Sequence, residues 1–413
     1  MTLKPGGAGR FQDLASTHPD WYEVIQNVFG EVVETRRDLR QHPELSFEEE
    51  RTAAIVSEKL RAWGFEVQEG VGKTGVVGVL KGEAPGPVVA LRADMDALPM
   101  MDEIDQPYVS LREGVAHTCG HDAHTSILLG VAKVMAEKGL DAGTLKLVFQ
   151  PAEEIGQGAA AMIEDGVLEN PKVDYMAGLH VHPTLKTGEF SITHDEFSCA
   201  AVDILELKIT GKGGHAAHPH LTIDPIMIAA QILVGVQQIV SRQTDPLDSV
   251  VLSFGQIQAG TKATIIPDAV VLKGTVRTLN PETRAVMEKR IGSIAKGIAQ
   301  SYGGDCEIDY QYVTPSIKQD DELRSLFIST ANELFGRDTV LIVKPSMGGE
   351  DFAYFSQEVP SVFFRLGTNG SEETAHPNHN TRFDVDEEAF LYGISVLSVL
   401  THKLLKTKKG ETE

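Results

Sequence analysis

The densest group of chemically versatile side chains lies between residues 117 and 124. It reads His117-Thr118-Cys119-Gly120-His121-Asp122-Ala123-His124 and holds one thiol, three imidazoles and one carboxylate. Cys, His and carboxylate side chains together are typical ligands of Zn, Mn, Co or Ni rather than of Ca or Mg. One or two of these residues would be common at the surface start of a helix, but five within one short segment favour a metal site.

Acidic or imidazole side chains also follow three predicted strands. Asp94 and Asp96 follow the apolar segment 88–91, Glu153 and Glu154 follow the segment 145–149, and His180-Val181-His182 follows the segment 175–179. In open α/β sheets, ligands bind outside the carboxyl ends of the strands. We therefore expect these side chains to gather at one edge of the sheet.

Adjacent carboxylates such as Glu153 and Glu154 are usually only solvated when they lie on a helix surface. At the end of a strand they are more informative, because neighbouring side chains leave an extended backbone in opposite directions. One of the two can then bind a metal while the other faces the bound water. The second position suits a general base that takes a proton from water and passes it to the leaving group.

Histidines also lie in two loops far from these segments. The polar loop Ala375-His376-Pro377-Asn378-His379-Asn380 precedes the last predicted helix, and the glycine-rich turn at residues 211–220 holds His215, His218 and His220. Surface loops often carry histidines, so the turn could be an ordinary polar hairpin tip. Alternatively, it carries a lid group that reaches the substrate.

Short apolar strands alternate with helices around these residues. The segments 75–80, 88–91, 145–149 and 175–179 are predicted strands, and helical periodicity covers 21–40 and 126–138. Ser46-Phe47-Glu48-Glu49 fits a capping box that opens a helix ended by Gly64. The pattern resumes after residue 315 with a helix at 321–335, a strand at 361–366 and a helix at 387–405. This alternation is typical of an α/β sheet covered by helices.

The middle of the chain follows a different order, βαββαβ. Its elements are predicted at 201–210, 225–242, 249–258, 268–278, 281–302 and 307–313. This is the order of the ferredoxin-like split βαβ motif, a complete small α+β domain. We therefore expect a metal-binding catalytic domain with a mixed sheet, formed by residues 1–197 and 315–413. The α+β domain at 198–314 is inserted into it.

Composition excludes several classes of protein. The chain has 413 residues, with 37 basic and 59 acidic side chains and a net charge of −22. So negative a balance argues against partners such as nucleic acid or an anionic membrane, which need clustered Lys and Arg. Three widely spaced cysteines exclude a disulfide-rich scaffold, and no apolar run reaches the length of a transmembrane helix. We expect a cytoplasmic protein.

At these residues the sequence resembles the co-catalytic metallopeptidase family of aminoacylases and glutamate carboxypeptidases. Within that family it is most similar to hippurate hydrolases, auxin-conjugate amidohydrolases and N-acyl-amino-acid hydrolases. The matching segments occur in the family's order. They are RADMDALPM (92–100), HTCGHDAHT (117–125), QPAEE (150–154), GLHVHP (178–183), GKGGHAAHPH (211–220), GTVRT (274–278), MGGEDFAYF (347–355) and HPNHNTRFDVDEEA (376–389).

The resemblance implies roles for individual residues. Glu153 becomes the general base, Asp96 orients a metal ligand, and His215 matches a lid histidine that reaches the partner subunit's site and helps hold the tetrahedral oxygen. His379 rather than His376 matches a family ligand, because of its spacing to the Arg-Phe-Asp-Val-Asp-Glu segment that follows. The implied metal ligands are Cys119, His121, Glu154, His180 and His379.

Other matching residues lie near the carboxylate of the amino-acid half of the substrate. They are Arg277 and the backbone of Gly348 and Gly349. This chain departs from the family at Thr264, which stands where relatives often have Asn before a Val-Ile-Pro-Asp sequence. A threonine hydroxyl can still donate a hydrogen bond, but its reach differs from that of a carboxamide.

The implied activity is metal-dependent hydrolysis of N-acyl or N-aroyl amino acids to a carboxylate and a free amino acid, with metal-activated water and Glu153 as base. The implied cofactor is one or two divalent ions per subunit (Mn, Zn, Ni or Co), and the implied assembly is a homodimer or homotetramer formed through the inserted domain. Two alternatives stay open, a carboxypeptidase or dipeptidase acting on short peptides and an N-acetyl-diamino-acid deacetylase. A non-catalytic small-molecule binding protein on the same fold would be expected to have lost Glu153 or a ligand, and none is missing.

Overall fold

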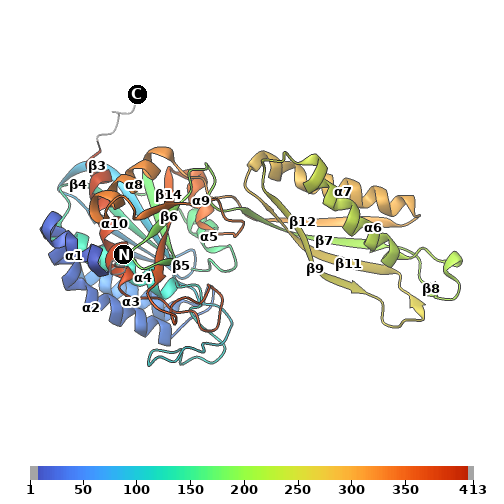
Figure 1. The fold of residues 1–413 in the computed structure, drawn as a ribbon, viewed down its shortest axis with the longest axis horizontal. Helices are drawn as coiled ribbons and strands as arrows, with labels where there is room; N and C mark the ends of the chain where they lie inside the picture. The colour runs from blue at the N-terminus through green and yellow to red at the C-terminus, as the bar shows by residue number, and fades with distance from the viewer. Residues whose placement is uncertain (1–7, 408–413) are drawn as a thin grey trace, which may run out of the picture. The chain divides into compact units, whose positions relative to one another are not determined.

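The computed structural model describes residues 8–407, which form two compact units (Figure 1). The α/β unit comprises the chain up to Glu196, Lys318–Lys344 and the chain from Tyr354 onward. The α+β unit comprises Phe197–Ile317 together with Pro345–Ala353. The α+β unit is therefore built from one long segment and one short, later segment.

The α/β unit contains an eight-stranded mixed sheet in the order β1-β2-β4-β3-β5-β14-β6-β13. The strands β3 and β4, β3 and β5, β5 and β14, and β6 and β13 pair in parallel, whereas the other neighbours are antiparallel. The mixed sheet expected from the sequence is therefore confirmed. The bounds are β1 (Glu66–Val71), β2 (Gly75–Lys81), β3 (Ala84–Asp94), β4 (Ala142–Gln150), β5 (Tyr175–Lys186), β6 (Phe190–Ile192), β13 (Val340–Ile342) and β14 (Ser361–Asn369).

The central strands are buried on both faces, which explains their continuous apolar sequences. Every residue from 145 to 150 of β4 and from 87 to 94 of β3 is buried. Such burial is expected of parallel strands that helices cover. The helices are α1 (Ala8–Thr17), α2 (Pro19–Gln41), α3 (Glu50–Ala62), α4 (His121–Lys138), α5 (Gly158–Glu164), α8 (Asp321–Phe335), α9 (Phe352–Glu358) and α10 (Ala389–Leu405).

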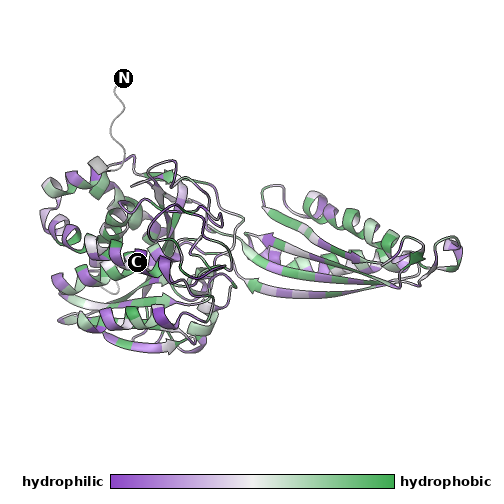
Figure 2. Cartoon of the chain, turned by 90° about the horizontal axis from the view of Figure 1, so that it is seen from below, coloured by the Kyte–Doolittle hydropathy of each residue, from purple (hydrophilic) through white to green (hydrophobic). Residues whose placement is uncertain are grey.

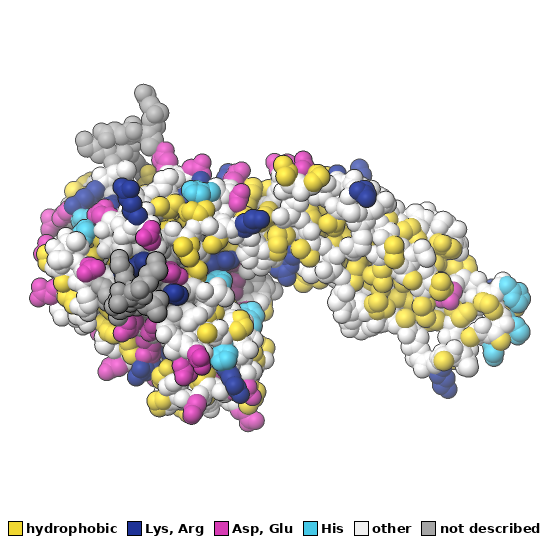
Figure 3. All heavy atoms as spheres, viewed as in Figure 1, with side chains coloured by type: hydrophobic (Ala, Val, Ile, Leu, Met, Phe, Trp, Pro, Cys, Tyr) yellow, Lys and Arg dark blue, Asp and Glu magenta, His cyan; other side chains and the backbone are white. Residues whose placement is uncertain are grey.

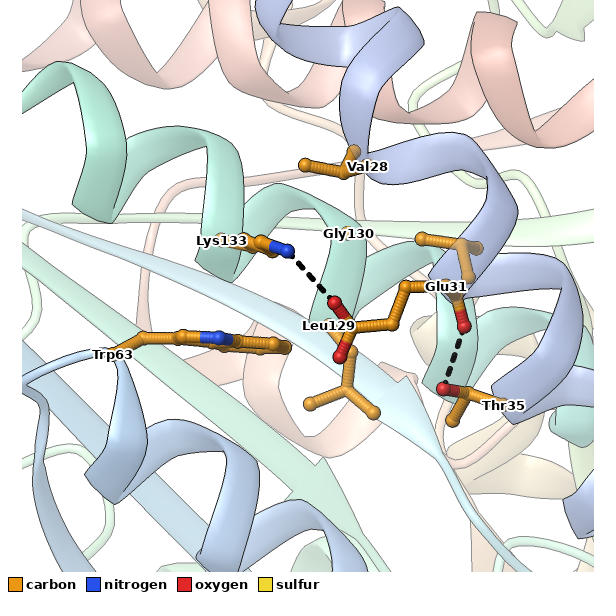
Figure 4. Close-up of a pocket in the computed structure, with 8 residues that line it drawn as sticks. Val28, Glu31, Thr35, Trp63, Leu129, Gly130 and Lys133 are labelled. Atoms are coloured by element: carbon orange, nitrogen blue, oxygen red, sulfur yellow. Dashed lines mark hydrogen bonds and ion pairs between the residues drawn. The ribbon is translucent and has the colours of Figure 1, made fainter.

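Helix α4 begins at His121, so its first turn carries the end of the 117–124 segment, and it packs between α2 and α10. A Cβ atom at Gly130 would lie 2.6 Å from Ile394 of α10 and 2.9 Å from Val32 of α2, so only glycine permits this approach. At the edge of the α2–α4 contact, the Glu31 carboxylate accepts a hydrogen bond from Lys133 Nζ at 2.7 Å (Figure 4). The position of α4 is thus set by close contacts on both sides.

The α+β unit contains a four-stranded antiparallel sheet in the order β12-β7-β11-β9, with two helices on one face (Figure 1). Burial alternates along β7, and its inward side chains belong to the same apolar core as buried side chains of α6 and α7. Figure 2 shows hydrophobic and hydrophilic residues interleaved along the strands and helices of this unit. The unit therefore has the ferredoxin-like arrangement expected from the sequence. The elements are β7 (Ala201–Thr210), β8 (Gly214–His215), η1 (Pro219–Leu221), α6 (Pro225–Gln238), η2 (Ile239–Gln243), β9 (Val250–Ala259), β10 (Ile265–Ile266), β11 (Ala269–Thr278), α7 (Pro281–Ser301) and β12 (Asp305–Thr314).

One helix, Pro225–Gln243 (α6 continued by η2), is long and apolar enough to cross a membrane by length and composition alone. A third of its most apolar window is buried, because Ile228, Ile232 and Val236 pack into the core of the α+β unit. Its apolar composition therefore has a structural explanation on one side of the helix.

The structure corrects two local expectations. The capping box at Ser46–Glu49 is wrong: α3 begins at Glu50 without a side-chain cap, and Ser46 Oγ instead donates to Asp96. Phe47 adopts a left-handed φ of 63°, which takes the segment out of helical geometry. The predicted end of a strand at residue 179 is also wrong, because β5 pairs with β14 in one register as far as His182 and pairs again at Lys186, where the strand ends.

Candidate metal centre

Asp96 connects the segments that carry the candidate ligands. It lies two residues beyond the end of β3, is buried, and accepts four hydrogen bonds. Its Oδ1 accepts from His121 Nδ1 (3.2 Å) and from the backbone N of Glu153 (3.1 Å). Its Oδ2 accepts from Ser46 Oγ (2.7 Å) and from the backbone N of Glu154 (3.1 Å). One carboxylate thus joins the first turn of α4 to the loop after β4.

The charge of Asp96 is stabilised by these donors. Burial raises its pKa, but the hydrogen bonds from His121 and Ser46 and the attraction of the His121 ring outweigh burial and lower the pKa below its ordinary value. An ionised Asp96 also determines the tautomer of His121. When the ring is neutral, as in a metal ligand, Nδ1–H donates to Asp96 and Nε2 presents its lone pair to the site.

Two buried atoms that can act as metal ligands have no hydrogen-bond partner among residues 8–407. They are His121 Nε2 and Glu154 Oε1, which lie 3.8 Å apart. Buried polar atoms are normally paired, and an imidazole lone pair facing a carboxylate oxygen is the arrangement that a cation completes. The residues present therefore fit a divalent metal ion.

The other candidate ligands surround these two atoms. His180 Nδ1 donates to the backbone O of Val181 at 2.7 Å, which leaves Nε2 facing Cys119 Sγ at 3.4 Å. His379 Nε2 lies 3.6 Å from Glu154 Oε2. Among the groups of side chains whose potential ligand atoms lie within 4.8 Å of one another, three combine the implied ligands and Glu153: Cys119, His121 and His180; Cys119, Glu154 and His379; and His121, Glu153 and Glu154. The structure thus brings together all five implied ligands with Glu153.

Burial favours the neutral forms of Cys119, Glu154 and His180. It raises the pKa of the Cys119 thiol well above its ordinary value, where Glu154 adds to the effect. It raises the pKa of Glu154 to about 7 and lowers that of His180 well below its ordinary range. At His121 burial is outweighed by the attraction of the Asp94 carboxylate, which raises the pKa of the ring well above its ordinary value. A divalent cation stabilises the thiolate and the carboxylate that bind it, so metal binding releases protons from such a site.

His124 belongs to the support of the site. Its Nδ1 donates to Asp94 Oδ1 at 2.6 Å, and its Nε2 accepts from the backbone N of Val181 at 2.9 Å. Both ring nitrogens are therefore engaged, and the ring packs edge-on against His180 at a centroid distance of 4.5 Å. Of the three histidines in the 117–124 segment, His121 presents its free nitrogen to the site.

Two buried arginines hold the loops that carry the ligands, and the sequence reasoning missed them. Arg36 donates to Asp122 at 2.8 Å, next to His121 in sequence, and to Asp384 at 2.6 Å. Arg40 donates to the backbone O of His117 at 3.2 Å and of Phe383 at 2.6 Å. The available signal was two arginines four residues apart among the apolar positions of α2.

The remaining candidate residues lie in the α+β unit, in two separate places. His215 and Thr264 are neighbours at the β8–β10 pairing, where the backbone N of Ala216 donates to Thr264 O at 3.0 Å. His215 Nδ1 accepts from the backbone N of Ala217 at 3.1 Å. The proton of the neutral ring is therefore on Nε2, which can act as a hydrogen-bond donor.

Arg277 and the Gly348-Gly349 segment form the second place. Arg277 Nε donates to Thr275 Oγ1 at 3.1 Å on β11. A Cβ atom at Gly349 would lie 3.3 Å from Arg277 Nη1 and 2.3 Å from Val202 Cγ2, so the glycine permits close packing beside the guanidinium. Gly348 N donates to Ser346 Oγ at 3.1 Å. The structure therefore places Arg277 beside the glycine pair expected to accompany it.

Known proteins match this chain along nearly its whole length. A hippurate hydrolase from Campylobacter jejuni is 38% identical over 383 residues, covering 92% of this chain and 98% of the relative. Thermostable carboxypeptidase 1 from Saccharolobus solfataricus is 39% identical over 399 residues, covering 94% and 99%. The crystal structure of a dinuclear metal-binding peptidase of the M20 family from Bacillus subtilis matches with a TM-score of 0.81 and 34% identity, covering 92% and 99%.

The match extends to the family as a whole. Residues 90–403 fit the model of peptidase family M20/M25/M40, which includes the segments of every candidate metal ligand. The aligned relatives are hydrolases of nearly the same length as this chain. The chain therefore belongs to peptidase family M20/M25/M40 and is a metal-dependent amidohydrolase or peptidase.

Proposed function

We propose that this hydrolase cleaves the amide bond of N-acyl or N-aroyl amino acids, releasing a carboxylate and a free amino acid, with Glu153 as general base. The observation that supports this most is that the adjacent residues Glu153 and Glu154 have different neighbours among the candidate metal ligands. Glu154 shares groups of potential ligand atoms with Cys119, His121 and His379, whereas Glu153 shares a group with His121 but none with Cys119 or His379. The similarity to a hippurate hydrolase supports the substrate class.

Cys119, His121, Glu154, His180 and His379 would hold one or two ions of Mn, Zn, Ni or Co. When bound, such an ion polarises the amide carbonyl and lowers the pKa of water. Glu153 takes one proton from the attacking water as the new C–O bond forms. It gives that proton to the amine nitrogen as the C–N bond breaks, so the base is regenerated.

The α+β unit supplies two further groups in this proposal. His215 donates its Nε2–H to the carbonyl oxygen as negative charge develops there, and in an oligomer it would serve the partner subunit. Arg277 binds the carboxylate of the amino-acid half as a planar fork, with Gly348 and Gly349 beside it and the Thr264 hydroxyl as a further donor. A local cation is needed because the chain's net charge of −22 repels free carboxylates.

A carboxypeptidase acting on short peptides is the second candidate, because the Saccharolobus relative is named as a carboxypeptidase and is 39% identical. Both candidates break an amide bond next to a free carboxylate. They differ in the group on the amino side, which is an uncharged acyl or aroyl group in one case and a peptide with a charged amine in the other.

The test is a substrate screen combined with Glu153→Gln. We expect release of free amino acid from hippurate or N-acetyl amino acids at a kcat/KM well above that for dipeptides, and the reverse ranking would favour the carboxypeptidase. We expect Glu153→Gln to retain its metal but to lose about 10²–10⁴-fold in kcat, the contribution of a positioned base. The exposed Glu164→Gln serves as control, and near-full activity of Glu153→Gln would contradict the assigned role.

We further propose a homodimer or homotetramer formed through the α+β unit. Its outer surface carries exposed apolar side chains on α6, namely Ile226, Met227 and Val234, the last 74% exposed (Figure 3). Strand β9 forms an edge of the four-stranded sheet in the same unit, and exposed apolar patches and open edges favour association. Light scattering of wild type and Val234→Glu tests this. We also propose a cytoplasmic location, since a reducing compartment preserves the Cys119 thiol.

A further inference from the structure

Glu49 is a buried acidic residue that none of the roles above uses. Its side chain is 0% exposed, and it immediately precedes α3 without capping that helix. Instead, Glu49 Oε1 accepts a hydrogen bond from the backbone N of Ala152 at 2.9 Å, and Oε2 accepts from Thr74 Oγ1 at 2.5 Å. A carboxylate from the start of α3 thus reaches the loop that carries Glu153 and Glu154.

Ala152 needs such a restraint because its backbone is in an unfavourable conformation. It has a φ of 52°, in the left-handed region that non-glycine residues rarely adopt, and it is fully buried. A residue of this kind costs on the order of 1–3 kcal/mol and persists only when its surroundings hold it in place. The bond from Ala152 N to Glu49 is one of those surroundings.

Three successive backbone N–H groups of this loop are bound by two buried carboxylates. Ala152 N donates to Glu49, Glu153 N donates to Asp96 Oδ1, and Glu154 N donates to Asp96 Oδ2. Hydrogen bonds to an ionised acceptor are roughly twice as strong as neutral ones. The loop therefore has little freedom to rotate about its own backbone.

We propose that Glu49 is a positioning residue that fixes the backbone of Ala152–Glu154 and thereby the direction of the Glu153 carboxylate. The proposal rests on the proposed function of Glu153 as base. Asp96 binds the two backbone N–H groups that follow Ala152. Without a further restraint, the backbone of Glu153 and Glu154 could still rotate as a unit about the φ and ψ bonds of Ala152. The hydrogen bond from Ala152 N to Glu49 restrains that rotation. The Glu49 carboxylate is in turn held by the hydrogen bond from Thr74 in the β1–β2 turn.

The variants Glu49→Ala, Glu49→Asp and Glu49→Gln test this. Glu49→Ala removes the acceptor. Glu49→Asp keeps the charge but is one C–C bond shorter, about 1.5 Å, so it no longer reaches Ala152 N and Thr74 together. Glu49→Gln keeps an acceptor oxygen of the same reach. The neighbouring Glu48→Gln, at a more exposed side chain that pairs with Arg112, is the matched control for loss of charge.

We expect Glu49→Ala and Glu49→Asp to lose about 10–100-fold in kcat, as expected for a misplaced reacting group, with KM and metal content close to wild type. Glu49→Gln should recover most of the kcat. A second readout needs no metal: amide hydrogen exchange of residues 152–157, measured by mass spectrometry on the metal-free protein. This exchange should be faster in the Ala and Asp variants and normal in Gln.

The outcomes separate this proposal from the proposed function. If Glu153→Gln is inactive while Glu49→Ala and Glu49→Asp keep full kcat and normal exchange, the role of Glu49 is wrong and that of Glu153 stands. If Glu153→Gln is active, the base assignment is wrong, whatever the exchange data show. A role through Glu153 also requires that Glu49→Ala cost little further activity in the Glu153→Gln background, and a full additional loss would contradict it.

Discussion

Replacing Arg36 by methionine should strongly destabilise the α/β unit. The Arg36 side chain is 0% exposed and its guanidinium lies 2.8 Å from Asp122 and 2.6 Å from Asp384, both buried, with Glu387 at 3.3 Å. Methionine fills part of the same volume but leaves these carboxylates without their cation. The change therefore removes a partner without removing the charges it compensates.

The expected loss is about 3–5 kcal/mol, the usual cost of removing one partner of a buried ion pair. That is a large part of a total stability of about 5–15 kcal/mol. Two of the three carboxylates are almost fully buried, so solvent can compensate little of the loss. Burial opposes the charge of Arg36, but Asp122, Asp384 and Glu387 outweigh it and raise the pKa of the guanidinium.

Urea denaturation followed by tryptophan fluorescence measures this effect in the correct unit, because the only two tryptophans, Trp21 and Trp63, both lie in the α/β unit. The matched control is Arg37→Met. The Arg37 side chain is 47% exposed, forms an ion pair with Glu387 and lies over the Tyr108 ring, so this variant should lose no more than about 1 kcal/mol. Equal losses in the two variants would refute the reasoning, since burial of the charges would then have no measurable effect.

Three further predictions concern the metal, the substrate and pH. Removal of metal with a chelator should abolish activity and lower the melting temperature. Added metal at 100 times its Kd should stabilise the folded state by about 2.7 kcal/mol and so restore the melting temperature. An unchanged melting temperature would exclude a site formed only in the folded state. Arg277→Lys should raise KM about tenfold or more with a smaller change in kcat, because a point charge does not replace a bidentate fork, and steady-state kinetics would reveal an unchanged KM. Glu31→Gln should cost about 0.5–1 kcal/mol at pH 7. Burial raises the pKa of Glu31 but Lys133 and Lys59 lower it further, so this stabilisation is present at neutral pH, and urea denaturation should show the difference disappearing as pH falls below the folded-state pKa.

Elements with a strong local pattern were predicted well. Helix α8 and strand β7 have the predicted bounds, 321–335 and 201–210. In α8, the Asp320 side chain accepts from the backbone N of Glu322 and Leu323 and marks the helix start. In β7, every second side chain is buried, and most of this alternation is visible in the sequence as apolar residues that alternate with polar ones. Periodicity and capping are local properties, so a short segment contains all the information needed.

Elements whose bounds depend on a distant partner were predicted less well. His180 lies within β5 because β14, far away in the sequence, extends the pairing to His182. Ser46 resembles a helix cap in the sequence, but its hydroxyl donates a hydrogen bond to the buried Asp96 carboxylate instead. The hydrogen bond from Ala152 to Glu49 has no local signal at all, since it joins residues 103 positions apart.

The sequence by itself determined the residue types, the periodicity of the main elements and the family, because each of these is carried by short segments and their order. The tertiary structure alone decided which donor atoms meet. Cys119 and His379 are brought into one group because Arg36, Arg40 and the hydrogen bond from His379 N to Thr118 O hold two distant loops together. It also decided that His121 directs Nε2 to the site while His124 does not, because Asp96, Asp94 and Val181 occupy the other ring nitrogens. Such choices depend on where buried charges find partners, and only packing of the whole unit settles that.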